Sequence, residues 1–126
     1  MTGFNIIWLV EDNPVDLFIN QRVLVQSGFN GTIVEMPSPE DALFELSKAD
    51  KLPDLILLDI RMPEMDGFEF LERLSAMPGD MVSAIRIILL SSTIDPLDLQ
   101  RAIANPIVLG FIPKPLTKEK LTGLSY

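Results

Sequence analysis

The sequence predicts an α/β fold in which a five-stranded parallel sheet is doubly wound, with strand order 2-1-3-4-5. Short apolar runs alternate with helix-like segments along the 126 residues. The runs that begin at Leu55 and Ile87 are continuously apolar, which is typical of central parallel strands covered on both faces. Because parallel strands joined by right-handed crossovers carry helices on both faces, five strand–helix units predict this sheet. The length fits one domain, residues 1–126.

Five segments have the length and apolar character of strands. They are Ile6–Val10, Thr32–Met36, Leu55–Leu58, Arg86–Leu90 and Val108–Ile112. The second of these is more mixed in polarity than the others, which predicts an edge strand.

Helices fill the gaps, and three of them are predicted to begin where a capping residue precedes a proline. These starts are Asn13-Pro14, Ser38-Pro39 and Asp95-Pro96. In the first helix, apolar residues recur at helical spacing, at Leu17, Phe18, Leu24 and Val25, and Gly28 is the expected stop. The other helices are expected at Pro39–Lys48, at about Phe68–Met77, from Pro96 to before Pro106, and briefly from Thr117 to about Leu121. Asp66-Gly67 is expected to form a turn, and Pro78-Gly79-Asp80 an extra loop.

Composition excludes several classes of function. Ten Lys and Arg against eighteen Asp and Glu give 10 − 18 = −8, which argues against binding nucleic acid or anionic lipid. The chain has no Cys and no His, so thiolate and imidazole chemistry are excluded. The apolar runs are too short to span a bilayer, and the first residues do not resemble a signal peptide. We therefore expect a cytoplasmic protein whose chemistry uses carboxylates, hydroxyls and lysine.

Reactive side chains follow four of the five predicted strands. Ligand sites in such sheets lie at the carboxyl ends of the strands. Glu11 and Asp12 follow the first strand, Asp59 the third, Ser91 and Ser92 the fourth, and Lys114 the fifth. Two carboxylates about 4 Å apart repel each other by about 4 kcal/mol at an effective dielectric constant of about 20. The three carboxylates therefore predict a hard divalent cation, and an all-oxygen site suits Mg²⁺.

A carboxylate nucleophile beside a hard metal, a lysine and a hydroxyl suits an incoming phosphoryl group. Phosphoryl transfer requires mainly positioning and charge neutralisation. The rigid apolar strand before Asp59 is expected to hold its carboxylate in place to attack phosphorus.

Over essentially its whole length, the chain resembles the receiver domain of two-component response regulators, of the single-domain, chemotaxis-regulator-like kind. Four segments carry the resemblance, in order: LVEDN, LLDIRMPEMDG, ILLSS and FIPKP. The resemblance implies a flavodoxin-like receiver fold, here with a short last helix. It also implies that Asp59 accepts a phosphoryl group from a partner's phosphohistidine. The partner would be a sensor histidine kinase or a histidine phosphotransfer protein, and the output would be a downstream protein whose identity the sequence does not reveal.

The resemblance further implies a role for each residue of the site. Asp12 would bind Mg²⁺ directly and Glu11 through water, with Asp59 and the backbone carbonyl of Arg61 as further ligands. Lys114 would pair with the phosphoryl oxygens. Three further roles are implied: Ser91 would move toward the phosphoryl group, Phe111 would follow it inward, and Pro115 would follow a cis peptide bond.

Other functions are weighed against this one. A nucleotide or flavin binder would carry a phosphate-binding loop where Glu11-Asp12-Asn13 stands, and a phosphatase would place another acid just after Asp59. Enzymatic activity is therefore expected only toward the chain's own phosphorylation and slow autodephosphorylation. The alternative that stays open is a receiver-like interaction module that switches without phosphate. A diffusible regulator, a phosphorelay carrier and a receiver from a longer protein also stay open.

Overall fold

The computed structural model describes residues 3–124, apart from the side chain of Met81. The strands are β1 (Ile6–Val10), β2 (Thr32–Met36), β3 (Leu55–Asp59), β4 (Arg86–Ser91) and β5 (Val108–Pro113). The helices are α1 (Pro14–Gln26), α2 (Pro39–Lys48), α3 (Gly67–Ser75), α4 (Gly79–Val82), α5 (Pro96–Ala104) and α6 (Lys118–Thr122). All the strand predictions are confirmed, and the last three strands each extend one residue further than expected.

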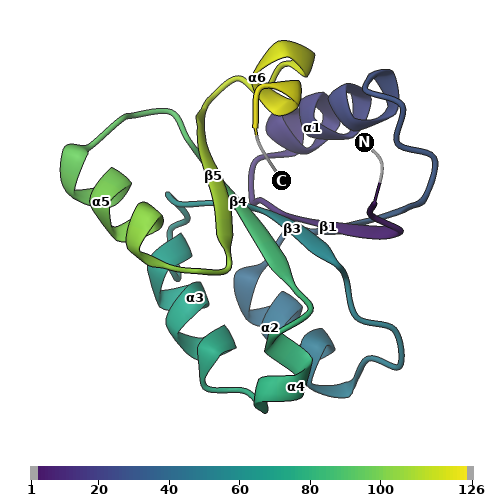
Figure 1. Ribbon diagram of the computed structural model, residues 1–126, viewed down its shortest axis with the longest axis vertical. Coiled ribbons are helices and arrows are strands. Elements are labelled where there is room, and N and C mark those ends of the chain that lie inside the picture. The colour runs from purple at the N-terminus through teal and green to yellow at the C-terminus, as the bar shows by residue number, and fades with distance from the viewer. Residues whose placement is uncertain (1–2, 125–126) are drawn as a thin grey trace.

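The five strands form one parallel sheet in the order β2-β1-β3-β4-β5, as predicted. Figure 1 shows α1 and α6 on one side of this sheet and α2, α3 and α5 on the other. The strands β1, β3 and β4 are inner strands, and the partly exposed β2 is an edge strand, as expected. The doubly wound architecture is therefore confirmed.

Each face of the sheet has its own hydrophobic core because side chains alternate along a strand. Trp8, Ile56 and Leu89 face one core, to which α2 and α3 contribute. Leu9 and Leu57 face the other core, to which α1 and α6 contribute. Packing on both faces fixes the inner strands, and therefore fixes the side chains that follow them.

The three predicted helix caps are present. The side chain of Asn13 accepts hydrogen bonds from the backbone N–H groups of Val15 and Asp16. Ser38 and Asp95 cap α2 and α5 in the same way. Gly28, beyond the end of α1, has a φ of +94°, a conformation that favours glycine. The capping chemistry of the sequence therefore fixes where these helices begin.

Two local predictions are wrong. Asp66 and Gly67 start α3 instead of forming a separate turn, because the Asp66 carboxylate accepts a hydrogen bond from the N–H of Glu69. The segment expected as an extra loop, Pro78-Gly79-Asp80, begins the four-residue helix α4. Both errors come from residues that favour turns and helix starts alike.

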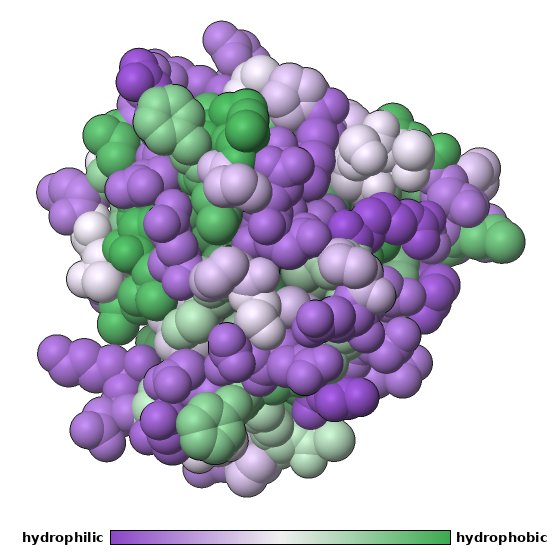
Figure 2. All heavy atoms as spheres, turned by 180° about the vertical axis from the view of Figure 1, so that it is seen from behind, coloured by the Kyte–Doolittle hydropathy of each residue, from purple (hydrophilic) through white to green (hydrophobic). Residues whose placement is uncertain are grey.

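The apolar residues of α1 do not all face the core. Leu17 and Leu24 are buried, whereas Phe18 and Val25 are 60% and 58% exposed. Seen from behind, apolar atoms gather at the surface on the side of the molecule where α1 lies (Figure 2). Positions one residue apart lie about 100° apart around a helix, so only one of each neighbouring pair faces the sheet.

The last strand is less firmly held than the inner ones. β5 is an edge strand whose register against β4 shifts between Ile87 and Ile88, and most of its residues are only half-buried. The short α6 follows it, with Thr117 as its N-cap and Gly123 as its C-cap. The sequence predicts a short helix here, from Thr117 to about Leu121.

No helix within residues 3–124 combines the length and apolar character that crossing a membrane requires.

Candidate functional site

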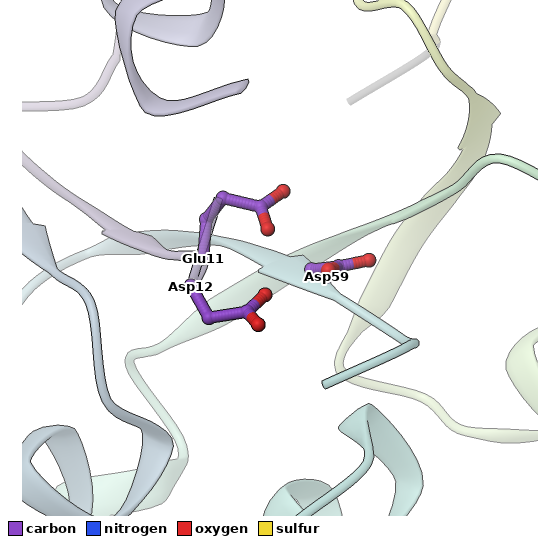
Figure 3. A group of neighbouring side chains, drawn as sticks. All are labelled: Glu11, Asp12 and Asp59. Carbon is purple, nitrogen blue, oxygen red and sulfur yellow. The ribbon is translucent and has the colours of Figure 1, made fainter. Parts of the chain in front are cut away.

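Three carboxyl groups converge at the carboxyl ends of β1 and β3. Val10 lies opposite Leu58 in the register of these strands, so the residues that follow, Glu11 and Asp59, emerge side by side. Figure 3 shows Glu11 and Asp12 reaching from the end of β1 toward the end of β3, where Asp59 lies. One ligand oxygen from each of the three lies within 4.8 Å of the others. The strand order thus brings together the three acids that the sequence places at strand ends.

Asp59 is buried, and its carboxylate lies beside the ammonium group of Lys114. Its residue is 3% exposed, and its Oδ1 accepts a hydrogen bond of 3.2 Å from the backbone N–H of Arg61. The same oxygen lies 3.3 Å from Nζ of Lys114. Gly67 lets α3 approach this loop, since a Cβ there would lie 3.0 Å from the carbonyl oxygen of Asp59.

Lys114 is brought to the acids by the end of β5. Its backbone N–H donates to the carbonyl oxygen of Ser91 at 2.7 Å, and its peptide bond to Pro115 is cis. Its Nζ donates to Oε1 of Glu11 at 2.7 Å and to Oδ2 of Asp16 at 2.8 Å. The ammonium group therefore has three carboxylate neighbours, counting Asp59.

Burial and crowding of negative charge shift two pKa values. Burial raises the pKa of Glu11 from 4.5 to about 8, and the neighbouring Asp59 raises it as well, while Lys114 acts in the opposite direction. Burial lowers the pKa of Lys114, but hydrogen bonds to Asp16 and Glu11 and the charge of Asp59 raise it more, to above its ordinary value. Lys114 is thus firmly protonated, and the ionised form of Glu11 is penalised until more positive charge arrives.

These groups line an open cleft of about 530 Å³. Four acidic residues line it: Glu11, Asp12, Asp16 and Asp59. Arg61 and Lys114 are the cationic residues of its lining. Asp12 and Arg61 are exposed, so solvent and a charged ligand reach the cleft directly.

Two residues implied by the family resemblance lie beside the cleft. Ser91 is fully buried and does not line it, and its Oγ accepts a hydrogen bond from the N–H of Thr93 at 3.2 Å. Ser92, the next residue, does line it. Phe111 is half-buried and packs against the core on the α2 and α3 side of the sheet. The roles of Ser91 and Phe111 as moving parts, like that of the Arg61 carbonyl, stay predictions.

Sequence reasoning missed two polar partners at the site. The sequence patterns do not single out Asp16, although it lies in the first turn of α1, directly after the capped start that follows Glu11 and Asp12. The sequence patterns do not single out Asp98 either, whose Oδ2 accepts a hydrogen bond from the Arg61 guanidinium. The position of Asp16 near the strand end was a usable signal, whereas nothing in the sequence linked Asp98 to Arg61.

The residues present fit a divalent metal ion. With all four carboxylates of the cleft ionised, Lys114 alone balances one of their charges, because the Arg61 guanidinium is paired with Asp98. Hard oxygen donors with one exposed member, Asp12, suit a cation that keeps some of its water, as Mg²⁺ does. Glu11, Asp12 and Asp59 are the carboxylates that would hold it.

Comparisons with known proteins agree with this architecture. Residues 7–124 match the family described as the response regulator receiver domain. A probable methanogenesis regulatory protein of Methanothrix harundinacea, FilR2, is 33% identical over 120 residues, covering 92% of this chain and 76% of that protein. The crystal structure of a two-component response regulator from Cytophaga hutchinsonii has a TM-score of 0.86 at 28% identity. The match covers 95% of this chain and 92% of that one.

A third relative is named as a sensor histidine kinase. The sensor histidine kinase CheAY of Helicobacter pylori is 29% identical over 117 residues, which cover 93% of this chain but 14% of that protein. The chain therefore spans only a small part of this relative, although it spans most of FilR2. Since the family match covers nearly the whole chain, the chain belongs to the response regulator receiver domain family of two-component signalling.

Proposed function

We propose that this receiver domain accepts a phosphoryl group on Asp59 from the phosphohistidine of a partner, in a reaction that requires Mg²⁺. One observation carries the proposal. The Asp59 carboxylate lies 3.3 Å from the Lys114 ammonium, in an open cleft that three further carboxylates line. An aspartate with a purely structural role would be destabilised by so many neighbouring carboxylates and would gain nothing from them.

In the proposed reaction a carboxylate oxygen of Asp59 attacks phosphorus. The new P–O bond forms as the P–N bond to the imidazole breaks, and the imidazole nitrogen takes the electron pair of that bond. The product is an acyl phosphate on Asp59. Lys114, already protonated and held at the cleft, supports this step by pairing with the phosphoryl oxygens.

A bound Mg²⁺ supplies neutralising charge for the carboxylates and for the phosphoryl oxygens. Glu11, Asp12 and Asp59, with the backbone carbonyl of Arg61, are the protein groups that would hold it. The buried Glu11, whose pKa is about 8, becomes an ionised ligand more readily when this charge is present.

The phosphoryl donor in this proposal is a histidine kinase or a phosphotransfer protein, since the chain has no histidine of its own. The presence of a similar domain within CheAY, named a sensor histidine kinase, supports a donor of that class. Catalysis is limited to the chain's own phosphorylation and slow autodephosphorylation, because Ile60 and Arg61 follow Asp59 where a phosphatase would place another acid. The phosphorylated form would act on a downstream protein, and a cytoplasmic location stays a prediction.

The test is intact-mass spectrometry after incubation with acetyl phosphate, with and without Mg²⁺. We expect a Mg²⁺-dependent gain of one phosphoryl mass in the wild type and in Asp50→Asn, and none in Asp59→Asn. Asp50 is an exposed aspartate of the loop after α2 and serves as the matched control. If rapidly quenched wild type shows no adduct, the phosphate-independent interaction module becomes the better description.

A further inference from the structure

An ion pair links the loop after Asp59 to helix α5. Arg61 follows Asp59 by two residues, and its backbone N–H donates to the Asp59 carboxylate at 3.2 Å. The Nη2 atom of its guanidinium lies 2.5 Å from Oδ2 of Asp98. Asp98 lies in the first turn of α5. One residue thus contacts both the proposed phosphoryl acceptor and a helix that lies 37 positions further along the chain.

The two members of this pair are unequally placed. Asp98 is 7% exposed. Within the described residues, its cationic partner is Arg61. The Arg61 side chain is 51% exposed and lines the cleft beside Asp59. A buried carboxylate depends strongly on its partner, whereas a half-exposed guanidinium changes partner at little cost.

A phosphoryl group on Asp59 would compete for this guanidinium. It brings close to two negative charges and three acceptor oxygens into the cleft. Guanidinium groups bind such oxygens through two parallel hydrogen bonds. Lys114 is the other cation of the cleft lining, and it already has three carboxylate neighbours. Arg61 is therefore the cation with the most freedom to meet the new charge.

We propose that Arg61 is a second phosphoryl-binding residue, whose resting partner is Asp98, and that it exchanges one for the other when Asp59 is phosphorylated. This inference rests on the proposed function. The exchange leaves the Asp98 carboxylate without its partner, so the first turn of α5 loses an anchor. That helix exposes Leu97 and Ile103, at 68% and 76%, and a change in its packing would move this apolar surface.

The test is a double-mutant cycle on beryllium fluoride, which occupies a carboxylate as a phosphoryl group does, with affinity measured by calorimetry in Mg²⁺. Asp98→Asn removes the competing charge and should tighten binding by about threefold to tenfold. Arg61→Ala should weaken it by about tenfold. In the Arg61→Ala background, Asp98→Asn should change the affinity by less than about twofold.

Controls separate this inference from a general effect on folding. Asp95→Asn changes the N-cap residue just before α5, whose carboxylate accepts a hydrogen bond from the N–H of Leu97, and it should leave the affinity unchanged. Thermal unfolding of each variant identifies losses of stability. If Asp98→Asn acts equally with and without Arg61, the exchange is overturned while the proposed function stands. If the wild type binds beryllium fluoride no better than Asp59→Asn does, both are overturned.

Discussion

An aspartate stands at each end of β3, and the two have opposite surroundings. Asp54, just before the strand, accepts hydrogen bonds from the backbone N–H groups of Asn5 and Ile6, at 2.8 and 3.1 Å. Asp59, the last residue of the strand, accepts one backbone hydrogen bond and shares Lys114 with Glu11 and Asp16. The backbone donors at the first end make its carboxylate a structural group. The surplus of acid at the second end fits the cation and the phosphoryl group of the proposed function.

The largest effect should come from removing the cation at the second end. Lys114→Met should slow phosphorylation by acetyl phosphate by about 100-fold, because the developing charge on the phosphoryl oxygens loses its partner. Time-resolved intact-mass spectrometry measures this rate. Lys118→Met, which changes an exposed lysine at the start of α6, is the matched control. Equal rates for the two variants would contradict the role of Lys114.

The burial of Glu11, together with the neighbouring Asp59, also predicts how stability depends on pH. The pKa of Glu11 is 4.5 when unperturbed and about 8 in the folded chain, so the folded state binds the proton more tightly. The contribution of protonated Glu11 to the free energy of unfolding is fully present below pH 4.5 and is lost as the pH rises through 8.

Glu11→Gln removes that dependence. In the absence of metal, we expect the variant to match the wild type near pH 5 and to exceed it by about 2 kcal/mol near pH 8.5. Urea unfolding at several pH values in EDTA measures the difference. Adding Mg²⁺ should reverse the order, because the ionised Glu11 of the wild type then has a partner. A stability gap that does not change with pH would be the contrary result.

A substitution of Asp54, at the first end of β3, should change the free energy of unfolding but not the rate of phosphorylation. Asp54→Ala leaves two N–H groups without their acceptor and should lower the free energy of unfolding by about 1–2 kcal/mol. The rate of phosphorylation should stay within about twofold of the wild type, since this end of the strand does not reach the cleft. Asp50→Ala is the control for unfolding. A large loss of phosphorylation in folded Asp54→Ala would remove the distinction between the two ends.

The smallest effect should come from Asp16, which shares Lys114 without being part of the three-acid group. Asp16→Asn removes one negative charge from the cleft and one competitor for the ammonium. Phosphorylation by the anionic acetyl phosphate should therefore be about twofold to fivefold faster. The same mass assay measures it, with Asp41→Asn, an acid in the first turn of α2, as the control. A slower rate would mean that Asp16 positions Lys114 for the reaction.

The sequence predicts much of this molecule because its local chemistry and its fold agree. Strand bounds follow from apolar runs, and three helix starts follow from caps such as Asn13 and Ser38. The convergence of Glu11, Asp12 and Asp59 follows from strand order, since each acid stands at the end of a strand. These features depend on patterns only a few residues long, together with one rule of topology.

The features that escaped prediction depend on which way a side chain turns. Phe18 is apolar and lies at helical spacing, yet it faces outward. The pairing of Arg61 with Asp98, and that of Lys114 with Asp16, joins residues 37 and 98 positions apart. No local pattern contains such a contact, because it is decided by packing between whole elements.

The way the strands share the site has a consequence for its local opening. Glu11 and Asp59 follow the inner strands β1 and β3, whereas Lys114 follows β5, a half-buried edge strand with a shift in register. Amide hydrogen exchange should therefore be slowest in the strands that precede the acids and faster in the strand that precedes the lysine. The acidic half of the site would then stay formed while the lysine is released and recaptured. Motion of the lysine would therefore widen the already open cleft without unfolding the strands that hold the acids.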